Sequence, residues 1–542
     1  MTTPAGEHPP AATGPSAVAG EPPGPQYFSH RQILVILLGV MAGMLLAALD
    51  QGIVGTALPR IVSELGGLDR LSWVVTAYLL TSTAATPLWG KISDLYGRRR
   101  IFQIAIGIFL VGSALSGLSQ NMPQLIAFRA IQGIGGGGLF AIALSIIGDV
   151  IPPRERGRYQ GYFGAVFGVS SVAGPLLGGW FTDGPGWRWI FYINLPIGLA
   201  ALVITSIVLR MPVARREHRI DYLGAATIVA AVSCLLLYLD WRGNEYGWTD
   251  PVALALVVGF VLLAALFVLI EVRTSEPIIP MRLFRNPVFS VGNLYGFLAG
   301  VAMFGAIIFL PIYLQAVKGL SPTASGLSLL PAILGIFSTS ITSGQLITRT
   351  GRYKLYPILG GVVLTGAMFL LAQLHVDTPF WKVFLYEYLF GAGLGFTLQT
   401  IVTAVQNAVE FRDMGAATSS ATFFRQMGGS IGAAVFGAVL SSRLAIYLSE
   451  RLAGAGLRPG AGTAIDPNDV QAIQRLTGPA KTLVLGAFTD ALDDVFLVGV
   501  PFLLVAFVVS LFLKEVPLRT GPGRPDATSP EGEVPVDTLG TH

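Results

Sequence analysis

Four charged residues stand inside long apolar stretches of this 542-residue chain, and their chemistry needs an explanation. They are Asp50, Arg129, Glu387 and Arg425. Placing one charge at the centre of a bilayer costs at least about 2.5–3.5 kcal/mol, so charges there are generally retained for function. A carboxylate can bind and release a proton, whereas an arginine stays charged. These residues therefore predict a path for protons or charged solutes, unless two acids and two bases merely neutralise one another as two inert pairs.

Fourteen apolar segments are long enough to carry these residues on membrane-spanning helices. About 20 residues, at about 1.5 Å per residue, cross the roughly 30 Å of bilayer hydrocarbon. Only 12% of the residues are charged, against about 25% in soluble proteins. The predicted spans are 32–58, 71–89, 101–119, 122–148, 159–181, 189–209, 222–239, 252–270, 288–317, 323–348, 355–374, 383–406, 415–440 and 495–513. The expected fold class is therefore that of an all-α membrane protein with 14 spans.

The basic residues of the short loops predict how the spans are oriented. With the N-terminus in the cytoplasm, the six cytoplasmic loops carry 18 Lys and Arg residues and the six short outer loops carry 6. Short cytoplasmic loops are enriched in these residues. We therefore expect a multi-pass protein of the cell (inner) membrane with both termini in the cytoplasm. The same enrichment explains the net charge of +4, so no nucleic-acid partner is expected.

A repeated loop pattern relates two parts of the chain. The segments 90–100 and 344–354 both contain a glycine, six residues, and then Gly-Arg followed by a basic residue two positions on. Parallel repeats of six helices are typical of alternating-access transporters. The predicted divisions are a disordered cytoplasmic tail (1–29), a six-helix bundle (30–210), a two-helix insertion (211–286), a second six-helix bundle (287–515) with an outer loop (441–494), and a second disordered tail (516–542).

Five motifs in chain order now support a family. They are the segments 49–59, 90–100, 129–135, 168–179 and 187–196. On these motifs the sequence resembles the major facilitator superfamily, in particular its fourteen-span drug:proton antiporter branch. The resemblance covers about residues 30 to 515. Gly52 and Gly55 depart from the branch pattern, which has Thr and Asn there. The resemblance implies the major facilitator fold, with two six-helix bundles and two additional central helices, in a multidrug efflux transporter.

In the resembling fold the first and fourth spans line a central cavity, so Asp50 and Arg129 can meet there. Helical rise places both in the outer half of the membrane, and places Glu387 and Arg425 near mid-depth. The twelfth span corresponds to the fourth in the repeat, so each half has one acid and one base. We expect all four residues to couple protons to substrate, and the two carboxylates to change charge.

The loop motif after the second span is expected to form a cytoplasmic gate. Gly90 and Gly97 permit a tight turn, and Asp94 can pair with Arg98. Asp149 ends the fourth span on the same side. By resemblance, the two acids and Arg98 match a charge cluster that locks the cytoplasmic side while the protein is open outward. Membrane anchoring by basic residues is the alternative, but it leaves the acids unexplained.

The fifth span carries the antiporter motif of the resembling branch. Gly168, Gly174, Gly178 and Gly179 leave one of its faces without side chains, and Pro175 can kink the helix. Such a face allows another helix to approach closely. The resemblance implies a gate that prevents leak, and ordinary packing of small residues is the alternative.

Aromatic and polar residues near the four charges are candidates for the lining of the cavity, because aromatic faces attract organic cations. The preferred candidates are Gln132, Tyr386, Tyr388 and Gln399. Tyr386 and Tyr388 are chosen because they flank Glu387. For any one of these residues, core packing or lipid contact is the alternative.

Enzymatic and cofactor chemistry finds little support in the sequence. The single cysteine, Cys234, stands in an apolar run, and the five histidines stand in tails or loops, so neither a metal site nor a catalytic constellation is visible. The glycine run 135–138 lacks the Lys-Ser or Lys-Thr of a nucleotide-binding loop. We therefore expect no enzyme, no metal and no cofactor, with the proton gradient as the energy source.

The sequence thus predicts a secondary active exporter that exchanges protons for hydrophobic or cationic drugs and toxic compounds, a function that gives antibiotic resistance. Proton and substrate would compete for one carboxylate. An exporter of a lipid or a dedicated natural product would have the same fold, and the outer loop 441–494 can dock a partner. A membrane sensor or enzyme is the least favoured alternative.

Overall fold

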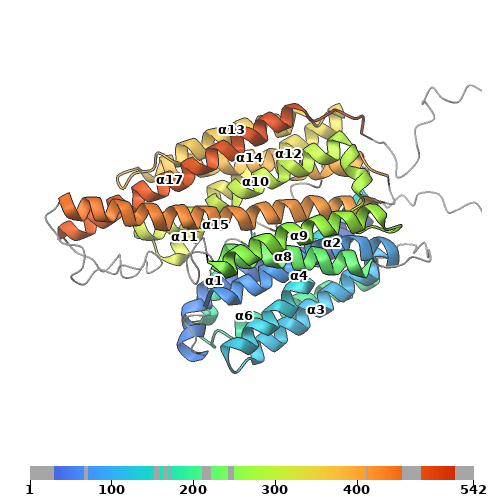
Figure 1. Cartoon of the computed structure of the whole chain (residues 1–542), viewed down its shortest axis with the longest axis horizontal. Coiled ribbons are helices and arrows are strands. Elements are labelled where there is room, and N and C mark those ends of the chain that lie inside the picture. Colours follow the sequence, from blue (N-terminus) through green and yellow to red (C-terminus); the bar gives the residue numbers. More distant parts are fainter. Residues whose placement is uncertain are drawn as a thin grey trace, which may run out of the picture.

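A computed structural model describes residues 30–65, 71–151, 184–209, 221–241, 250–410, 413–454 and 478–518, with 159, 162, 166, 169–170, 173–174 and 176–182 in between. The regular elements in these parts are all helices. Figure 1 shows them in two groups that run along the long axis of the molecule, with α8 and α9 between the groups and α15 at their boundary. The predicted tail 1–29 and residues 519–542 of the predicted tail 516–542 lie outside the described residues.

The first group of helices corresponds to the N-terminal half. Its members are α1 (His30–Leu65), α2 (Leu71–Tyr96), α3 (Arg98–Leu118), α4 (Met122–Val150), α6 (Trp189–Tyr192) and α7 (Asn194–Val208). The predicted break between the third and fourth spans is confirmed. The Asn121 side chain accepts a hydrogen bond from the backbone N–H of Gln124 at 2.9 Å and so caps the start of α4.

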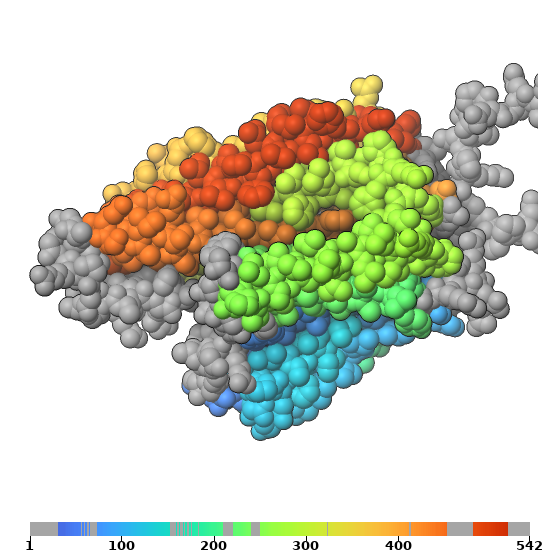
Figure 2. Space-filling view, in the orientation of Figure 1, coloured from blue at the N-terminus to red at the C-terminus, as the bar shows by residue number. Residues whose placement is uncertain are grey.

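The second group follows the two insertion helices, α8 (Tyr222–Trp241) and α9 (Pro251–Arg273). It contains η2 (Met281–Arg285), α10 (Pro287–Ile312), the π-helical turn η3 (Tyr313–Val317), α11 (Pro322–Ser328), α12 (Leu330–Thr350), α13 (Leu355–Leu371), α14 (Phe380–Asn407), α15 (Met414–Gly454) and α17 (Gly478–Leu511). Most of α9 faces outward with apolar side chains, as expected of a helix in contact with lipid. In Figure 2, α9 is separated from α10 by a recess, and atoms of α15 form part of its floor.

The all-α membrane fold is confirmed, but the number of 14 spans is not. Eleven helices of the described residues are long and apolar enough to cross a membrane, and α13 is a shorter apolar helix. α2 coincides with a predicted span but is not among the eleven. The predicted fifth span, 159–181, is described only in part, and its described residues, 176–181 among them, are helical.

The segment 441–494, predicted to be an outer loop, is partly helical. α15 continues to Gly454 and α17 already begins at Gly478, and residues 455–477 lie outside the described part. Polar contacts hold the two extensions together: Arg443 Nε lies 3.1 Å and Tyr447 Oη 2.9 Å from Asp494 Oδ2, and Arg451 pairs with Asp490. Hydropathy marks where a helix meets lipid, so the polar continuation of these helices escaped the prediction.

The start of the predicted tail 516–542 also differs from expectation. Asn407 Nδ2 donates to the carbonyl oxygen of Pro517 at 3.1 Å, and the Val516 N–H donates to Tyr353 Oη at 3.1 Å. These contacts attach residues 516–518 to the ends of α13 and α14.

Two glycine triplets show how closely the halves repeat one another. Gly133, Gly135 and Gly137 on α4 recur as Gly391, Gly393 and Gly395 on α14, each 258 residues further along the chain. A Cβ atom at the first or third glycine of either triplet would overlap the backbone of the preceding partner helix, α2 or α12, and one at the middle glycine would overlap α3 or α13. Equivalent residues therefore occupy equivalent positions, and Arg129 corresponds to Glu387 at the same offset.

Candidate functional site: two related positions with different charges

A buried network surrounds Asp50 in the N-terminal half. Arg129 Nη1 donates to Asp50 Oδ2 at 2.6 Å, and Gln132 Nε2 donates to Asp50 Oδ1 at 2.8 Å. The same Arg129 nitrogen donates to Gln132 Oε1 at 2.7 Å. Asp50 and Gln132 are fully buried and Arg129 almost so. The predicted meeting of Asp50 with Arg129 is therefore present, and Gln132 belongs to the same network.

The Arg129 guanidinium has further neighbours that compensate its burial. Its Nε donates to the backbone oxygen of Val74 at 3.2 Å. Its Cζ lies 4.4 Å from the centre of the Tyr78 ring and 5.8 Å from that of Phe191. An aromatic face stabilises a cation that is removed from water. Arg129 can therefore keep its charge in this position when the charge of Asp50 changes.

Sequence reasoning missed Asn194, which also contacts Asp50. Its Nδ2 donates to Asp50 Oδ1 at 3.3 Å and to Ser113 Oγ at 3.0 Å. Asn194 is the first residue of α7, after the short α6. The motif 187–196 pointed to this residue, but an asparagine within a motif does not indicate which side chain it will touch.

Glu387 occupies the corresponding position in the C-terminal half, without a corresponding network. It is fully buried, and neither carboxylate oxygen has a hydrogen-bond partner among the residues that the structure describes. The counterpart of Asp50 falls at 306–308 on α10, where the chain has Ala and two Ile. Glu387 is the eighth residue of α14, as Arg129 is of α4, so it lies nearer the outer end than the predicted mid-depth.

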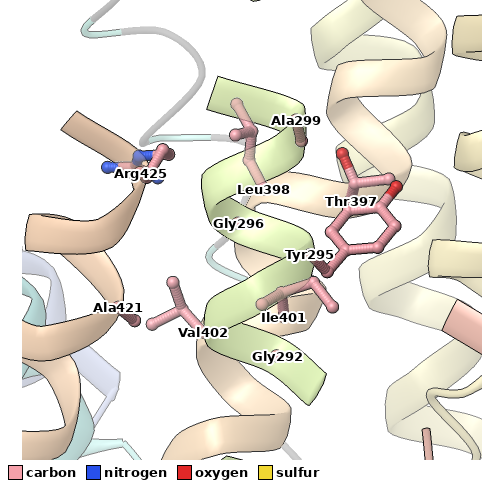
Figure 3. A pocket seen from close by; sticks show the side chains of 10 residues that line it. All are labelled: Gly292, Tyr295, Gly296, Ala299, Thr397, Leu398, Ile401, Val402, Ala421 and Arg425. Atoms are coloured by element: carbon pink, nitrogen blue, oxygen red, sulfur yellow. The ribbon is translucent and has the colours of Figure 1, made fainter. Parts of the chain in front are cut away.

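Arg425 lies on α15 and does not pair with Glu387. Within the described part of the chain, its side chain makes no ion pair. It borders a cavity of about 20 Å³, large enough for about one water molecule. Figure 3 shows Arg425 on one side of α10, with Tyr295 and Thr397 on the other. Two acid–base pairs were considered from the sequence. Asp50 and Arg129 form one of them, whereas Glu387 and Arg425 do not pair.

The other predicted cavity residues are scattered. Tyr386 packs against the apolar core of the C-terminal half, and Tyr388 is exposed, with its Oη 3.1 Å from Ser338 Oγ. Gln399 is half-buried. Neither tyrosine hydrogen-bonds Glu387, because residues adjacent to it on a helix point in other directions.

The predicted gate residues form one cluster at the helix ends that are predicted to lie in the cytoplasm. Arg98 pairs with Asp94, and its Nε lies 2.7 Å from Asp149 Oδ2. Asp94 Oδ2 also accepts the backbone N–H of Ala416 at 3.0 Å. Ala416 is in the first turn of α15, where backbone N–H groups lack partners within the helix and attract negative charge. Asp94 thus joins the two halves.

The two gate glycines have different tasks. Gly97 has a φ of +93°, a conformation that favours glycine, and it ends α2. Gly90 lies inside α2 and not in the expected turn, and a Cβ there would come within 2.7 Å of the Gly415 oxygen. Gly90 is therefore small because α15 passes close to it.

Further ion pairs lie on the same side. Lys91 Nζ lies 2.6 Å from Glu276 Oε2, and Arg282 Nη2 lies 2.8 Å from Asp413 Oδ1. Together with the Asp94 contact to Ala416, they connect α2, the segment before α10, and the start of α15. The two halves are therefore joined along these contacts at this end of the molecule.

The antiporter motif is described only in part. Gly168 and Pro175 lie outside the described residues. A Cβ on Gly174 would come within 3.0 Å of the Gly52 backbone, and Gly178 is buried while Gly179 is half-buried. This close approach of the α1 backbone favours glycine at position 174.

A charged cluster fixes the C-terminal end of α1. Glu64 Oε2 accepts from Trp187 Nε1 at 2.9 Å and from Arg188 Nη1 at 3.3 Å. Arg60 Nε lies 3.1 Å from the other Glu64 oxygen. The Trp187 hydrogen bond, aided by the two arginines, lowers the pKa of the Glu64 carboxyl group. Two residues of the motif 187–196 therefore hold the helix that carries Asp50.

No group of three or more His, Cys, Asp or Glu residues suited to a metal ion occurs in the described part of the chain. Cys234 is half-buried and lies beside Gly259 of the neighbouring helix α9.

Comparison with known proteins agrees with this geometry. The sequence model of the Major Facilitator Superfamily matches residues 40–433. An uncharacterised MFS-type transporter of Mycobacterium tuberculosis is 40% identical over 512 residues, which are 93% of this chain and 74% of that protein. The multidrug transporter protein MdtP of Bacillus subtilis is 36% identical over 506 residues, which are 89% and 93% of the two chains.

A solved structure shows the same fold at low identity. The proton:xylose symporter XylE aligns with a TM-score of 0.57 and 13% identity, over 90% of this chain and 97% of that one. Taken with the sequence matches and the apolar helices, this makes the chain a multi-pass membrane transporter. The protein belongs to the major facilitator superfamily.

Proposed function

We propose that the protein is a proton-coupled antiporter that exports hydrophobic or cationic compounds across the cell membrane, with both termini in the cytoplasm. The observation that carries the proposal is the buried Asp50–Arg129 pair, with Gln132 as a shared neighbour. Relatives that are named efflux pumps, at 32% and 36% identity, support the direction of transport.

Charge arithmetic at this pair gives a simple coupling rule. With Asp50 ionised, the pair is neutral overall. A proton on Asp50 cancels its negative charge, while Arg129 stays positive. The site then repels a cation, so proton and cationic substrate exclude one another. This exclusion is what an antiporter needs in order to exchange one for the other.

The cytoplasmic contacts supply the conformational part of the proposal. Asp94, Arg98 and Asp149 form the gate that holds the cytoplasmic side closed, through the N–H of Ala416. Opening toward the cytoplasm has to break this contact and the ion pairs beside it. Gly174, close to the backbone of Gly52, belongs to the leak-preventing face of the fifth span.

Glu387 has a different task in this proposal. Burying an ionised carboxylate without a partner is costly, so the pocket favours the protonated, neutral form. It becomes useful as an anion only when a second positive charge arrives. We propose that Glu387 selects substrates with two positive charges and that Asp50 performs the coupling.

A second candidate function is the export of an anionic lipid or natural product. Arg425, which borders a cavity and has no acidic partner in the described part of the chain, favours this candidate. An anionic group on the substrate would compensate its charge.

The test uses purified full-length protein in liposomes with an imposed pH gradient. We expect a fluorescent organic cation to move only with the gradient, and Asp50→Asn to abolish the movement. Glu450→Gln, on the exposed outer part of α15, is the matched control. Transport of a fluorescent anion but not of the cation would replace the first candidate by the second.

A further inference from the structure

The side chain of Asn194 joins the carboxylate of Asp50 to the break between α6 and α7. It is fully buried, and its Nδ2 lies 3.3 Å from Asp50 Oδ1 and 3.0 Å from Ser113 Oγ. Ser113 Oγ in turn donates to the backbone oxygen of Phe191 at 2.8 Å. These contacts form one chain from Asp50 to α6.

The chain fixes the orientation of the Asn194 amide. Since the Ser113 hydroxyl group donates its proton to Phe191, it acts as an acceptor toward Asn194, so the amide nitrogen has to face it. The amide oxygen Oδ1 then has no hydrogen-bond partner among the described residues. A buried acceptor without a partner is unfavourable, and it is therefore available for a new donor.

We propose that Asn194 responds to the protonation of Asp50 by reversing its hydrogen bonds. When a proton from the outer solution binds Asp50 Oδ1, that oxygen becomes a donor. The amide turns over, and its Oδ1 accepts from the protonated carboxyl group. The Ser113 hydroxyl group then turns to donate to the same Oδ1 and releases the Phe191 oxygen. This inference rests on the proposed function, in which Asp50 is the proton site.

When Ser113 releases the Phe191 backbone oxygen, protonation of Asp50 affects the backbone of α6. Phe191 lies in α6, two residues before Ile193, at which α6 passes into α7. The Ile193 N–H also bonds the Phe191 and Trp189 oxygens, so the Phe191 oxygen stays satisfied after Ser113 leaves it. Protonation would therefore loosen the attachment of this junction to α3.

The other groups near Asp50 do not offer the same acceptor. Among the described residues, the charged or titratable side chains that face it are Arg129 on α4 and Tyr78 on α2. Gln132 Oε1 already accepts from Arg129. α3 and α7 contribute the neutral Ser113 and Asn194.

Two substitutions should shift the protonation of Asp50 in opposite directions. Asn194→Leu has a similar size but removes the acceptor for the proton, while the ionised carboxylate keeps its two closer donors. We expect the midpoint of Asp50 protonation to fall by about one pH unit. Ser113→Ala removes the partner that holds the amide in its present orientation, so the midpoint should rise by a few tenths of a pH unit or more.

The experiment is a pH titration of the carboxylic-acid band in infrared difference spectra of the purified full chain in nanodiscs. The band that Asp50→Asn removes is assigned to Asp50. Asn293→Leu, on α10, is the matched control. Among the described residues, buried Asn293 also has an Oδ1 without a partner, and its Nδ2 donates to the Phe289 oxygen. It should leave the midpoint unchanged.

The possible results separate the inference from the function on which it rests. Opposite shifts in Asn194→Leu and Ser113→Ala support the inference, and if the leucine variant does not fold, an upward shift in Ser113→Ala supports it alone. An Asp50 band with the parental midpoint in the variants that fold overturns it. If Asp50→Asn removes no titrating band, the proposed function itself fails.

Discussion

The Arg129 and Glu387 positions compare the same backbone arrangement with two different charges. Both are the eighth residue of a helix that carries a glycine triplet, and the triplets pack against α2 and α12 in the same way. Arg129 has an acid, an amide and an aromatic ring around it, whereas Glu387 has no polar partner in the described part. The repeat thus preserves helix packing and allows the chemistry to diverge.

This difference teaches how a membrane protein can hold two acids in different states. A carboxylate beside a guanidinium is stabilised as an anion, and a carboxylate in an apolar pocket is stabilised as a neutral acid. In the proposed function, one half therefore has a group that exchanges its proton for a cation, and the other half has a carboxyl group that keeps its proton. The following predictions test whether the two positions really differ in this way.

The largest effect is expected from Arg129→Leu. It leaves Asp50 buried without its counter-charge, and breaking a buried pair in this way costs about 3–5 kcal/mol. Thermal unfolding in detergent should show a marked loss of stability, together with loss of transport. The control is Arg443→Gln in the partly exposed outer pair, where about 0–1 kcal/mol is expected. Equal effects of the two variants would remove the distinction between a buried and an exposed pair.

The next largest loss of stability is expected at the glycine triplets, which both halves contain. Gly133→Ala places a methyl group against the backbone of α2, and Gly391→Ala places one against the backbone of α12. Overpacking of this kind costs about 1–3 kcal/mol. We expect similar losses of unfolding free energy in both variants, and almost none in Gly107→Ala, which has open space around it. A large loss in one half alone would show that the two glycine triplets are not equivalent.

A smaller effect is expected from Asp94→Asn at the cytoplasmic gate. Removing a charge near a helix N-terminus costs about 0.3–1 kcal/mol, and somewhat more in a buried setting. The equilibrium should shift toward opening on the cytoplasmic side, with lower transport and normal membrane insertion. The measurement is the alkylation rate of Ser419→Cys, beside Gly90. Cys234→Ser removes the native cysteine, so that alkylation reports the opening at position 419. An unchanged rate would make Asp94 an ordinary surface residue.

The smallest effect on stability is expected from Glu387→Gln. A protonated carboxyl group and an amide have similar size and are equally without partners here, so unfolding should change by less than about 1 kcal/mol. Transport of singly charged and neutral substrates should persist, while dicationic substrates should be lost. A loss of stability as large as that of Arg129→Leu would mean that Glu387 has a partner after all.

Much of the Asp50 site could be predicted because its residues stand in motifs and on spans that repeat. The charges, their helices and the meeting of Asp50 with Arg129 all follow from that pattern. The absence of an acid–base partner for Glu387 could have been predicted from the repeat. Aligning the two glycine triplets places the apolar residues 306–308 at the position that corresponds to Asp50. Asn194 could not be assigned in this way, because its contact depends on the break between α6 and α7.

Helix boundaries were less predictable where helices leave the membrane. The extensions of α15 and α17 are rich in charged residues that pair with each other, so their helical structure leaves no trace in hydropathy. Gly90 was predicted as a turn residue for a similar reason. Its sequence neighbourhood gives no sign of α15, which lies more than 300 residues away in the chain.

The central claim is that Asp50, and not Glu387, exchanges its proton for substrate. The most direct measurement is the release of protons from purified protein in weakly buffered detergent when a cationic substrate is added, near the pH at which Asp50 is half protonated. The parent and Glu387→Gln should release protons with a singly charged substrate, and Asp50→Asn should release none. Unchanged release and unchanged transport in Asp50→Asn would contradict the account.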